Sequence, residues 1–315
     1  MVETILIVRP SGVCAGVQRA MRSLDMAIRS CPPPIFCRHW IVHNDFVVNS
    51  YIRRGVVFVE DVKSVPDGAV LVLSAHGNSP TVFDEARAKH LRIIDATCPL
   101  VTKVHWEAKR AIKDGYFVIY VGHSAHPETI GVLAEMQNGA FALVEDTEGA
   151  EKLQIAEESS KKLILLNQTT LSVDDIAEIR GILKRKYSAL SFPPASDICY
   201  ATQNRQAAVR GLVKMADVVL VVGSEISSNS LRLRDLAERL GRRSYLVGGE
   251  GDVKSEMLDD CKTLGITAGA SSPEDLVQKI VDKISQKYGG LVKELRVMEE
   301  DISFPILPTI EGKYT

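Results

Sequence analysis

Short apolar runs alternate along the chain with segments in which apolar residues recur every three or four positions. Such runs are typical of strands buried in a parallel sheet, and the longer spacing is typical of amphipathic helices. The pattern predicts strands at Thr4–Val8, Val56–Val59, Ala69–Leu73, Arg92–Ile94, Phe117–Val121, Phe141–Val144, Leu163–Leu166, Val218–Val222, Ser244–Val247 and Leu264–Thr267. It predicts helices at Val17–Ile28, Thr81–Ala88, Val101–Lys113, Val173–Lys186, Asn204–Met215, Ser228–Leu240 and Pro273–Gln286. The alternation predicts an α/β protein.

Two series of similar segments indicate a threefold internal repeat. A strand runs into a polar loop in AVLVLSAHGNSP, YFVIYVGHSAHPE and DVVLVVGSEISSNS, and another runs into a turn in LRIIDATCP, LILLNQTTLS and LGITAGASSPE. We expect three α/β units related by pseudo-threefold symmetry, each with a small, mostly parallel sheet, at residues 1–97, 98–198 and 199–285, followed by a tail at 286–315. The strand at 4–8 completes either the first or the third of these. Because ligands bind at the carboxyl ends of parallel strands, the loops are expected to converge on a central site.

Composition narrows the classes of function. The 315 residues are 45% apolar and 25% charged, with a formal net charge of −2. This is ordinary for a soluble globular protein and leaves no basic field to hold nucleic acid or an anionic membrane. The start MVETILIVRP does not match a signal peptide, and no apolar run reaches transmembrane length. We expect a cytoplasmic monomer, in which six cysteines are thiols or metal ligands rather than disulfides.

Three of the cysteines stand in similar settings, each directly before a helical pattern. They are Cys14 in ILIVRPSGVCAGVQRA, Cys98 in LRIIDATCPLVTKV and Cys199 in PASDICYATQNRQAAV. Helix N-termini favour thiolates and anionic clusters. Any one of these cysteines could be a buried, inert side chain, but three in matched settings favour one metal or cluster site with an open position. The other three, Cys31, Cys37 and Cys261, are interpreted as structural.

Polar residues in the matched loops predict an anion site. Imidazole, hydroxyl and amide groups can together hold a phosphate without a bulky cation. His76 and His126 occupy corresponding loops of the first two units, and Ser227, Ser228 and Asn229 occupy that place in the third. Each histidine could instead be a hydrogen-bonded core residue, and the matched positions favour the anion site.

Glu128 follows His126 and Pro127 at the mouth of these loops. Beside an anionic cluster and a phosphate its pKa would rise, so it could deliver a proton near neutral pH. The alternative is a solvated glutamate at a helix start. Thr169 and Thr170 could relay that proton or cap the following helix. A G-x-G-x-x-G fingerprint is absent from the sequence, so nicotinamide binding is not indicated.

Longer motifs carry a resemblance to a known family. SGVCAGVQRA, IVHN, SAHG-x-SP, DATCPLVTKVH, GH-x-x-HPE, QTTLSVDD, DICYATQNRQ, VVGS-x-x-SSNS-x-RL and TAGAS-x-PE occur in this order between residues 4 and 285. The chain resembles the 4-hydroxy-3-methylbut-2-enyl diphosphate reductase family. The resemblance implies three α/β units around a [4Fe–4S] cluster, with Cys14, Cys98 and Cys199 as ligands and a fourth iron open to the substrate's alcohol oxygen.

The same resemblance implies roles for further residues. Thr169 would contact the substrate hydroxyl, Glu128 would supply the proton, and the diphosphate would be held by His43, His76, His126, Ser227, Ser228, Asn229 and Ser271. Two electrons from a ferredoxin or flavodoxin would yield isopentenyl and dimethylallyl diphosphates from the allylic diphosphate substrate, the last step of the non-mevalonate isoprenoid pathway.

The sequence departs from the usual family pattern at Val13, at Ile226 and in the stretch TIGVLAEM after Glu128. None of these departures removes a named ligand. Two other classes of function would use part of this set of residues. A non-catalytic iron–sulfur sensor would need only the three thiols, and a zinc hydrolase would need a metal bound by three cysteines.

Overall fold

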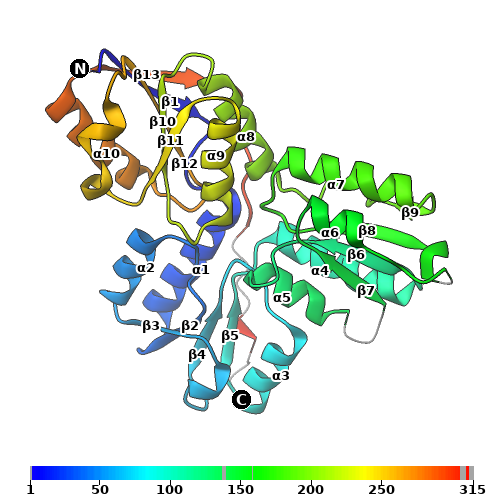
Figure 1. The fold of residues 1–315 in the computed structure, drawn as a ribbon. Helices are drawn as coiled ribbons and strands as arrows, with labels where there is room; N and C mark the ends of the chain where they lie inside the picture. Colours follow the sequence, from blue (N-terminus) through cyan, green and yellow to red (C-terminus); the bar gives the residue numbers. More distant parts are fainter. Residues whose placement is uncertain (1, 137–139, 158, 306–309, 312–315) are drawn as a thin grey trace. The chain divides into compact units, whose positions relative to one another are not determined.

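The computed structural model describes residues 2–136, 140–157, 159–305 and 310–311. Its helices and strands alternate along the chain, which confirms the predicted α/β class (Figure 1). The strands are β1 (Thr4–Arg9), β2 (Ile35–Arg38), β3 (Val56–Val59), β4 (Val70–Leu73), β5 (Arg92–Asp95), β6 (Phe117–Val121), β7 (Phe141–Val144), β8 (Leu163–Asn167), β9 (Leu190–Ser191), β10 (Val218–Val222), β11 (Arg243–Val247), β12 (Thr263–Ala268), β13 (Leu291–Arg296) and β14 (Ile310–Glu311). The α-helices are α1 (Ala15–Ser30), α2 (Asp45–Ile52), α3 (Pro80–Ala88), α4 (Pro99–Lys113), α5 (Pro127–Ala134), α6 (Thr147–Lys152), α7 (Val173–Lys186), α8 (Tyr200–Leu212), α9 (Ser228–Arg239) and α10 (Glu274–Tyr288).

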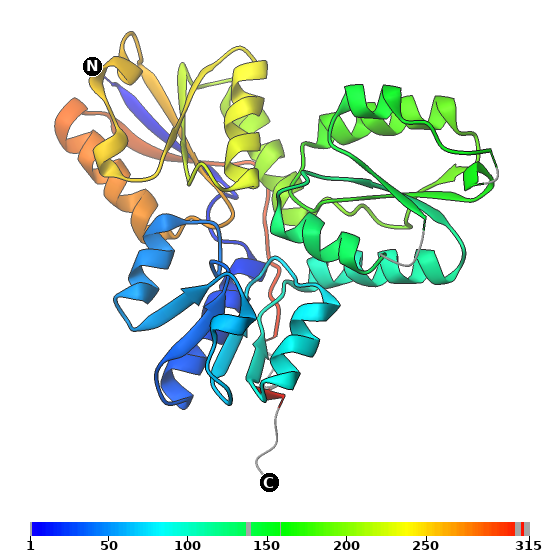
Figure 2. The ribbon, with the colours of Figure 1, turned by 60° about the horizontal axis from the view of Figure 1, so that its bottom comes forward.

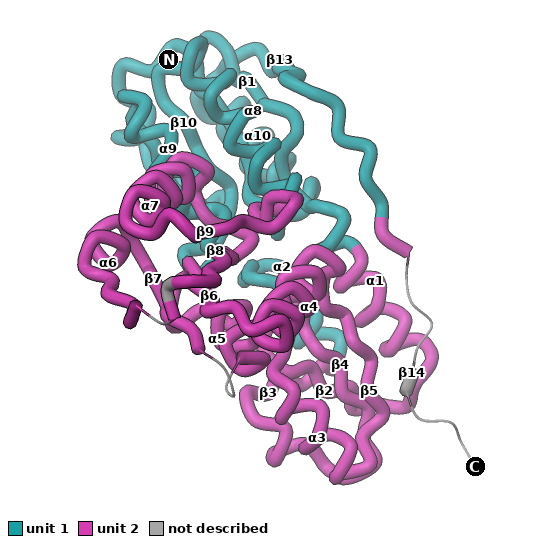
Figure 3. Tube along the Cα trace, turned by 90° about the vertical axis from the view of Figure 1, so that its right-hand side faces the viewer, with its two compact units in different colours: residues 1–18, 42–54, 200–303 teal, residues 19–41, 55–199, 304–315 magenta. Residues whose placement is uncertain are grey.

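The chain divides into two compact units, coloured separately in Figure 3. Unit 1 comprises residues 1–18, 42–54 and 200–303, and unit 2 comprises residues 19–41, 55–199 and 304–315. Unit 1 contains a sheet in the order β11-β10-β12-β1-β13. Unit 2 contains two sheets, β14-β5-β4-β2-β3 and β7-β6-β8-β9. The division of the sequence into three units and a tail stays a prediction, and residues 306–309 and 312–315 of that tail lie outside the described residues.

Helices cover both faces of the sheet in unit 1, as Figure 2 shows. Strand β10 has the sequence VVLVV, and all five residues are buried because each face packs against helices. Val218, Leu220 and Val222 belong to the core with α10. Val219 and Val221 belong to the core with α8 and α9. Burial on both faces explains why the strand is a continuous apolar run.

The sheet of β6 and β8 in unit 2 follows the same rule. Ile119 packs with α6 and α7, and its neighbours Val118 and Tyr120 pack with α4 and α5. In the other sheet of unit 2, Leu71 and Leu73 of β4 share a core with α3. All sheet pairings are parallel among the described residues except that of β14 with β5. No helix within these residues is long and apolar enough to cross a membrane.

Several elements differ from the pattern-based prediction. Helix α8 begins at Tyr200, directly after Cys199, rather than at Asn204. Among the described helices and strands the prediction missed seven, namely β2, α2, α5, α6, β9, β13 and β14. Strand β13 was missed because its side chains are mostly exposed and therefore show no apolar pattern. The strand is defined instead by its backbone pairing with β1. The short helices were missed because one or two turns leave too few positions for a periodic signal.

Candidate active site

The three cysteines in matched settings stand at the starts of helices. Cys14 directly precedes α1, Cys98 is the N-cap of α4, and Cys199 directly precedes α8. All three are partly exposed, whereas Cys31, Cys37 and Cys261 are buried, so the two groups differ in accessibility as well as in setting. Helix N-termini stabilise thiolates, and partial exposure allows them to reach a ligand.

The loop that carries Cys14 is built onto the end of β12. Gly12 donates its N–H to the carbonyl of Ala268 at 3.0 Å, and Cys14 donates to the carbonyl of Ala270 at 3.1 Å. Gly12 has φ 75°, and a Cβ there would lie 3.1 Å from the carbonyl oxygen of Ser272. Position 12 therefore requires glycine, because the backbone angle and the close carbonyl oxygen both disfavour a side chain. The N–H of Val17, in the first turn of α1, points at the Cys14 Sγ, 3.5 Å away.

In unit 2 the backbone places Cys98 and Cys199 beside other predicted site residues. The N–H of Cys98 donates to the carbonyl of Ala75 at 3.0 Å, next to His76. The N–H of Cys199 donates to the carbonyl of Thr169 at 3.0 Å. The loops at the carboxyl ends of β4 and β8 are thus joined directly to two of the thiol-bearing segments.

Glu128 is buried, with only 2% of its surface exposed, so the alternative of a solvated helix-start glutamate is wrong. The N–H of Thr169 donates to its Oε1 at 2.7 Å, and the Thr169 hydroxyl donates to its Oε2 at 2.8 Å. Burial raises the pKa of Glu128 to about 7, although both Thr169 hydrogen bonds oppose the shift. The negative charge of Asp197 adds a smaller increase in this pKa. A carboxyl group with this pKa can hold and release a proton near neutral pH.

His76 and His126 lie close together in unit 2. Their ring centroids are 6.0 Å apart and the rings are perpendicular at 88°. His126 is the N-cap of α5, and its Nδ1 accepts from the N–H of Glu128 at 3.2 Å. In the neutral ring this leaves the proton on Nε2, which can donate to an anionic oxygen. The pair therefore offers imidazole groups next to the buried acid.

A second polar set lies in unit 1. Asn229, in the first turn of α9, is 4% exposed, and among the described residues neither polar atom of its side chain has a hydrogen-bond partner. Ser227 caps the same helix by accepting from the N–H of Ser230. Ser271 donates its hydroxyl to the carbonyl of His43 at 2.9 Å, which joins two further predicted residues. A buried amide with this hydrogen-bonding capacity can bind a polar ligand, and a helix N-terminus favours an anionic one.

The predicted site residues are divided between the two units. Glu128, Thr169, His76, His126, Cys98 and Cys199 belong to unit 2, and Cys14, His43, Ser227, Ser228, Asn229 and Ser271 belong to unit 1. Within the described residues, no group of three or more histidine, cysteine, aspartate or glutamate side chains is able to hold a metal ion. A site made from all three thiols therefore stays a prediction.

An ion pair in unit 2 with a buried carboxylate was missed from sequence. Lys103 of α4 donates to Asp197 at 2.7 Å, and Asp197 also accepts from the N–H of Asn167 at 3.1 Å. The pair ties the helix that follows Cys98 to the segment that leads into Cys199. The two charges are far apart along the chain, so the sequence does not show that they pair. It shows only that Asp197 lies in the motif DICY and Lys103 in the motif VTKVH.

The fold and these residues define a class: an α/β protein of small parallel sheets whose strand-end loops present thiols, imidazoles and a buried acid. The family model described as LytB protein matches residues 5–285, and the chain belongs to this family. The resemblance found from the motifs is thereby confirmed.

Named relatives agree over nearly the whole chain. A 4-hydroxy-3-methylbut-2-enyl diphosphate reductase of Haemophilus influenzae (strain PittEE) is 46% identical over 304 residues, which cover 96% of both proteins. One from Methylibium petroleiphilum is 46% identical and covers 97% of this chain and 92% of that protein. The solved structure of the E-1-hydroxy-2-methyl-but-2-enyl-4-diphosphate reductase from Plasmodium falciparum matches with TM-score 0.94 and 35% identity, covering 98% of this chain and 96% of that chain.

Proposed function

We propose that this chain is an oxidoreductase that converts (E)-4-hydroxy-3-methylbut-2-enyl diphosphate to isopentenyl and dimethylallyl diphosphates. The carbon–oxygen bond of the allylic alcohol breaks, two electrons and two protons are taken up, and the oxygen leaves as water. The relatives named 4-hydroxy-3-methylbut-2-enyl diphosphate reductase, which are about as long as this chain, support this choice of substrate. The structural observation that carries the proposal is the buried Glu128, with its pKa near neutrality and both Thr169 donors on its carboxylate.

Glu128 is the proposed proton donor. When it is ionised, Thr169 donates to Oε2 across 2.8 Å. When it is protonated, this hydrogen bond can reverse, so that Glu128 donates and the Thr169 hydroxyl turns its own proton onward. Such a pair delivers a proton to the departing hydroxyl without opening the buried site to bulk water.

The diphosphate is proposed to be held by neutral donors rather than by cations. The proposed donors are His43, His76, His126, Ser227, Ser228, Asn229 and Ser271. The unpartnered Asn229 amide and the start of α9 support this assignment, because both offer donors to an anion.

Members of this family depend on an iron–sulfur centre, and we propose Cys14, Cys98 and Cys199 as its ligands. The donors suit such a centre, since these thiols alone among the six are partly exposed and each stands at a helix start. A [4Fe–4S] cluster bound in this way supplies single electrons and one open iron position. We further propose that a ferredoxin or flavodoxin provides the electrons and that the protein is a cytoplasmic monomer.

The test is anaerobic turnover by the cluster-loaded chain with a viologen reductant, with both products quantified. Glu128→Gln should abolish turnover while iron and sulfide contents stay the same. Glu135→Gln, which changes another glutamate seven positions along the chain, is the matched control and should remain active. A wild-type chain that holds its cluster but forms neither product would contradict the reductase and favour the sensor. Zinc in place of iron, with release of phosphate, would favour the hydrolase.

A further inference from the structure

Arg205 is a buried cation in unit 1 for which the proposed reaction has no use. It lies in α8, the helix that follows Cys199, and only 1% of its side chain is exposed. Its Nε and Nη2 both donate to the carbonyl of Gly12, at 3.0 and 2.7 Å. Its Nη1 donates to the carbonyl of Ala201 at 3.0 Å. Two donors on one carbonyl fix both its position and its direction.

The carbonyl that Arg205 holds belongs to the loop of Cys14. Gly12 precedes that cysteine by two residues, and the opposite side of the loop is hydrogen-bonded to the end of β12 through Gly12 and Cys14 themselves. Directly after Cys14, the N–H of Ala15 donates to the hydroxyl of Tyr200 at 3.1 Å. Two residues of helix α8 thus hydrogen-bond to the loop on either side of Cys14. Arg205 binds the carbonyl of Gly12, and Tyr200 binds the N–H of Ala15.

The charge of Arg205 is balanced by the C-terminal part of unit 1. Glu300 accepts from Nη1 and Nη2 of Arg205, each at 3.2 Å, and from the Asn204 side chain at 2.9 Å. The Glu300 side chain is itself largely buried, with 13% exposed. An arginine this deeply buried needs such a counterion, because an unpaired charge in the interior is costly.

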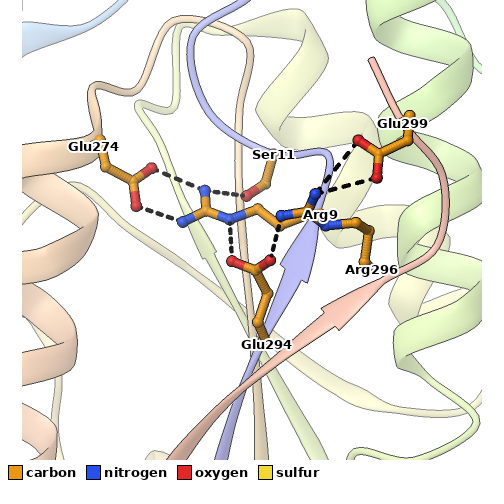
Figure 4. A network of polar contacts seen from close by, with 6 residues as sticks. All are labelled: Arg9, Ser11, Glu274, Glu294, Arg296 and Glu299. Atoms are coloured by element: carbon orange, nitrogen blue, oxygen red, sulfur yellow. Dashed lines mark hydrogen bonds and ion pairs between the residues drawn. The ribbon is translucent and has the colours of Figure 1, made fainter. Parts of the chain in front are cut away.

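The segment that delivers Glu300 is fastened to the strand that leads into the same loop. Strand β13 pairs with β1 up to Arg9, and the N–H of Val297 donates to the Arg9 carbonyl at 2.9 Å. Figure 4 shows the side-chain network around this point. Arg9 bonds Glu274 and Glu294, and Arg296 bonds Glu294 and Glu299. The course of residues 291–297 is therefore set by β1, and Glu300 follows three residues later, against Arg205.

We propose that Arg205 and Glu300 are positioning residues for Cys14: the Arg205 guanidinium holds the Gly12 carbonyl, and Glu300 balances its charge and keeps it in place. The inference rests on the proposed role of Cys14 as a cluster ligand. It gives residues 291–300 a function at the cluster, although they lie beyond the family match, which ends at residue 285.

The test measures how firmly the cluster is held in the full chain, reconstituted anaerobically. Arg205→Met should speed iron loss to a chelator by about tenfold or more, since charged hydrogen bonds to the loop are lost. It should also alter the electron paramagnetic resonance spectrum of the reduced cluster. Arg205→Lys, which keeps the charge but cannot fork, should lie between Arg205→Met and wild type. Glu300→Gln keeps an acceptor oxygen and the size of the side chain but removes the negative charge opposite Arg205. It should therefore also speed iron loss.

Glu299→Gln is the matched control, because Glu299 neighbours Glu300 but its side chain is 79% exposed and pairs with Arg296. It should release iron at the wild-type rate. A purely structural role would lower the thermal midpoint of the cluster-free protein and leave the spectrum unchanged. Wild-type iron loss and spectrum in folded Glu300→Gln and Arg205→Lys would overturn the inference, even if Arg205→Met does not fold.

Cys14→Ser separates this inference from the proposal beneath it. If Cys14→Ser keeps wild-type iron content and spectrum, the ligand assignment itself is wrong. If Cys14→Ser lowers the iron content or changes the spectrum while the Arg205 and Glu300 variants behave as wild type, the ligand assignment stands and only the positioning role fails.

Discussion

Replacing Glu128 by glutamine should stabilise the folded protein, and the gain should be much larger at pH 8 than at pH 5. Burial raises the pKa of this carboxyl from 4.5 to about 7, so the folded state binds its proton more tightly than the unfolded state does. The stability of the folded state therefore falls as pH rises from about 4.5 to about 7, and the loss is complete above that range. At about 1.4 kcal/mol per pKa unit, the ionised carboxylate costs roughly 3 kcal/mol at pH 8. Glutamine is neutral and of the same shape, so it removes this cost.

The hydrogen bonds to Thr169 survive the change. The glutamine oxygen can accept from the Thr169 N–H, and the Thr169 hydroxyl can turn to accept from the amide. Glu128→Gln should thus raise the free energy of unfolding by roughly 3 kcal/mol at pH 8 and by less than about 1 kcal/mol at pH 5.

Urea unfolding of the cluster-free chain at the two pH values measures the effect. Both tryptophans, Trp40 and Trp106, lie in unit 2 with Glu128, so their fluorescence reports on the relevant unit. Glu135→Gln is the control of opposite sign. Burial opposes ionisation of Glu135, but hydrogen bonds from His105 and Lys109 outweigh it and lower its pKa, so glutamine should destabilise there at both pH values. Equal stability changes at pH 5 and pH 8 in Glu128→Gln would refute the buried-acid reasoning.

Three further changes follow from burial and pairing. Asn229→Leu should stabilise the ligand-free chain by about 1 kcal/mol, because it removes buried polar atoms that have no hydrogen-bond partner. It should also raise KM about tenfold. An unchanged KM would mean that Asn229 does not contact the diphosphate. Lys103→Met should cost up to about 3 kcal/mol at pH 8 and less at pH 5, because burial raises the pKa of Asp197 and Lys103 lowers it. Without Lys103, the buried carboxyl at pH 8 must either stay charged without its partner or take up a proton. A pH-independent loss in tryptophan-monitored unfolding would contradict this. Leu220→Ala should cost roughly 2–5 kcal/mol by circular dichroism, since Leu220 is 0% exposed in β10, an interior strand of its sheet; a loss below about 1 kcal/mol would mean that the core relaxes to fill the space.

Local pattern located most of the fold. Strands such as β6 and β10 are apolar runs buried on both faces, and the sequence shows them directly. The apolar period also located helix α7, although its N-cap is Ser172 rather than Thr169 or Thr170. Strand β13 could not be found this way, because its exposed side chains carry no apolar signal and its existence depends on hydrogen bonds to β1.

The candidate site was only partly accessible from sequence. The setting of Cys14, Cys98 and Cys199 was visible because a helix start is a local feature, and the structure shows a helix directly after each. The interior position of Glu128 was not visible. A carboxylate in the motif HPE is as compatible with solvent as with burial, and Thr169, its partner, stands 41 positions further along the chain.

The order of residues along the chain was enough to establish the α/β class, the thiols at helix starts and the family, because each rests on neighbours within a few positions. Folding in three dimensions settled which charges are buried and what balances them. Arg205 meets Glu300 from 95 positions away, and Lys103 meets Asp197 from 94. Burial and charge balance arise from contacts between residues distant in sequence, and no local pattern encodes such contacts.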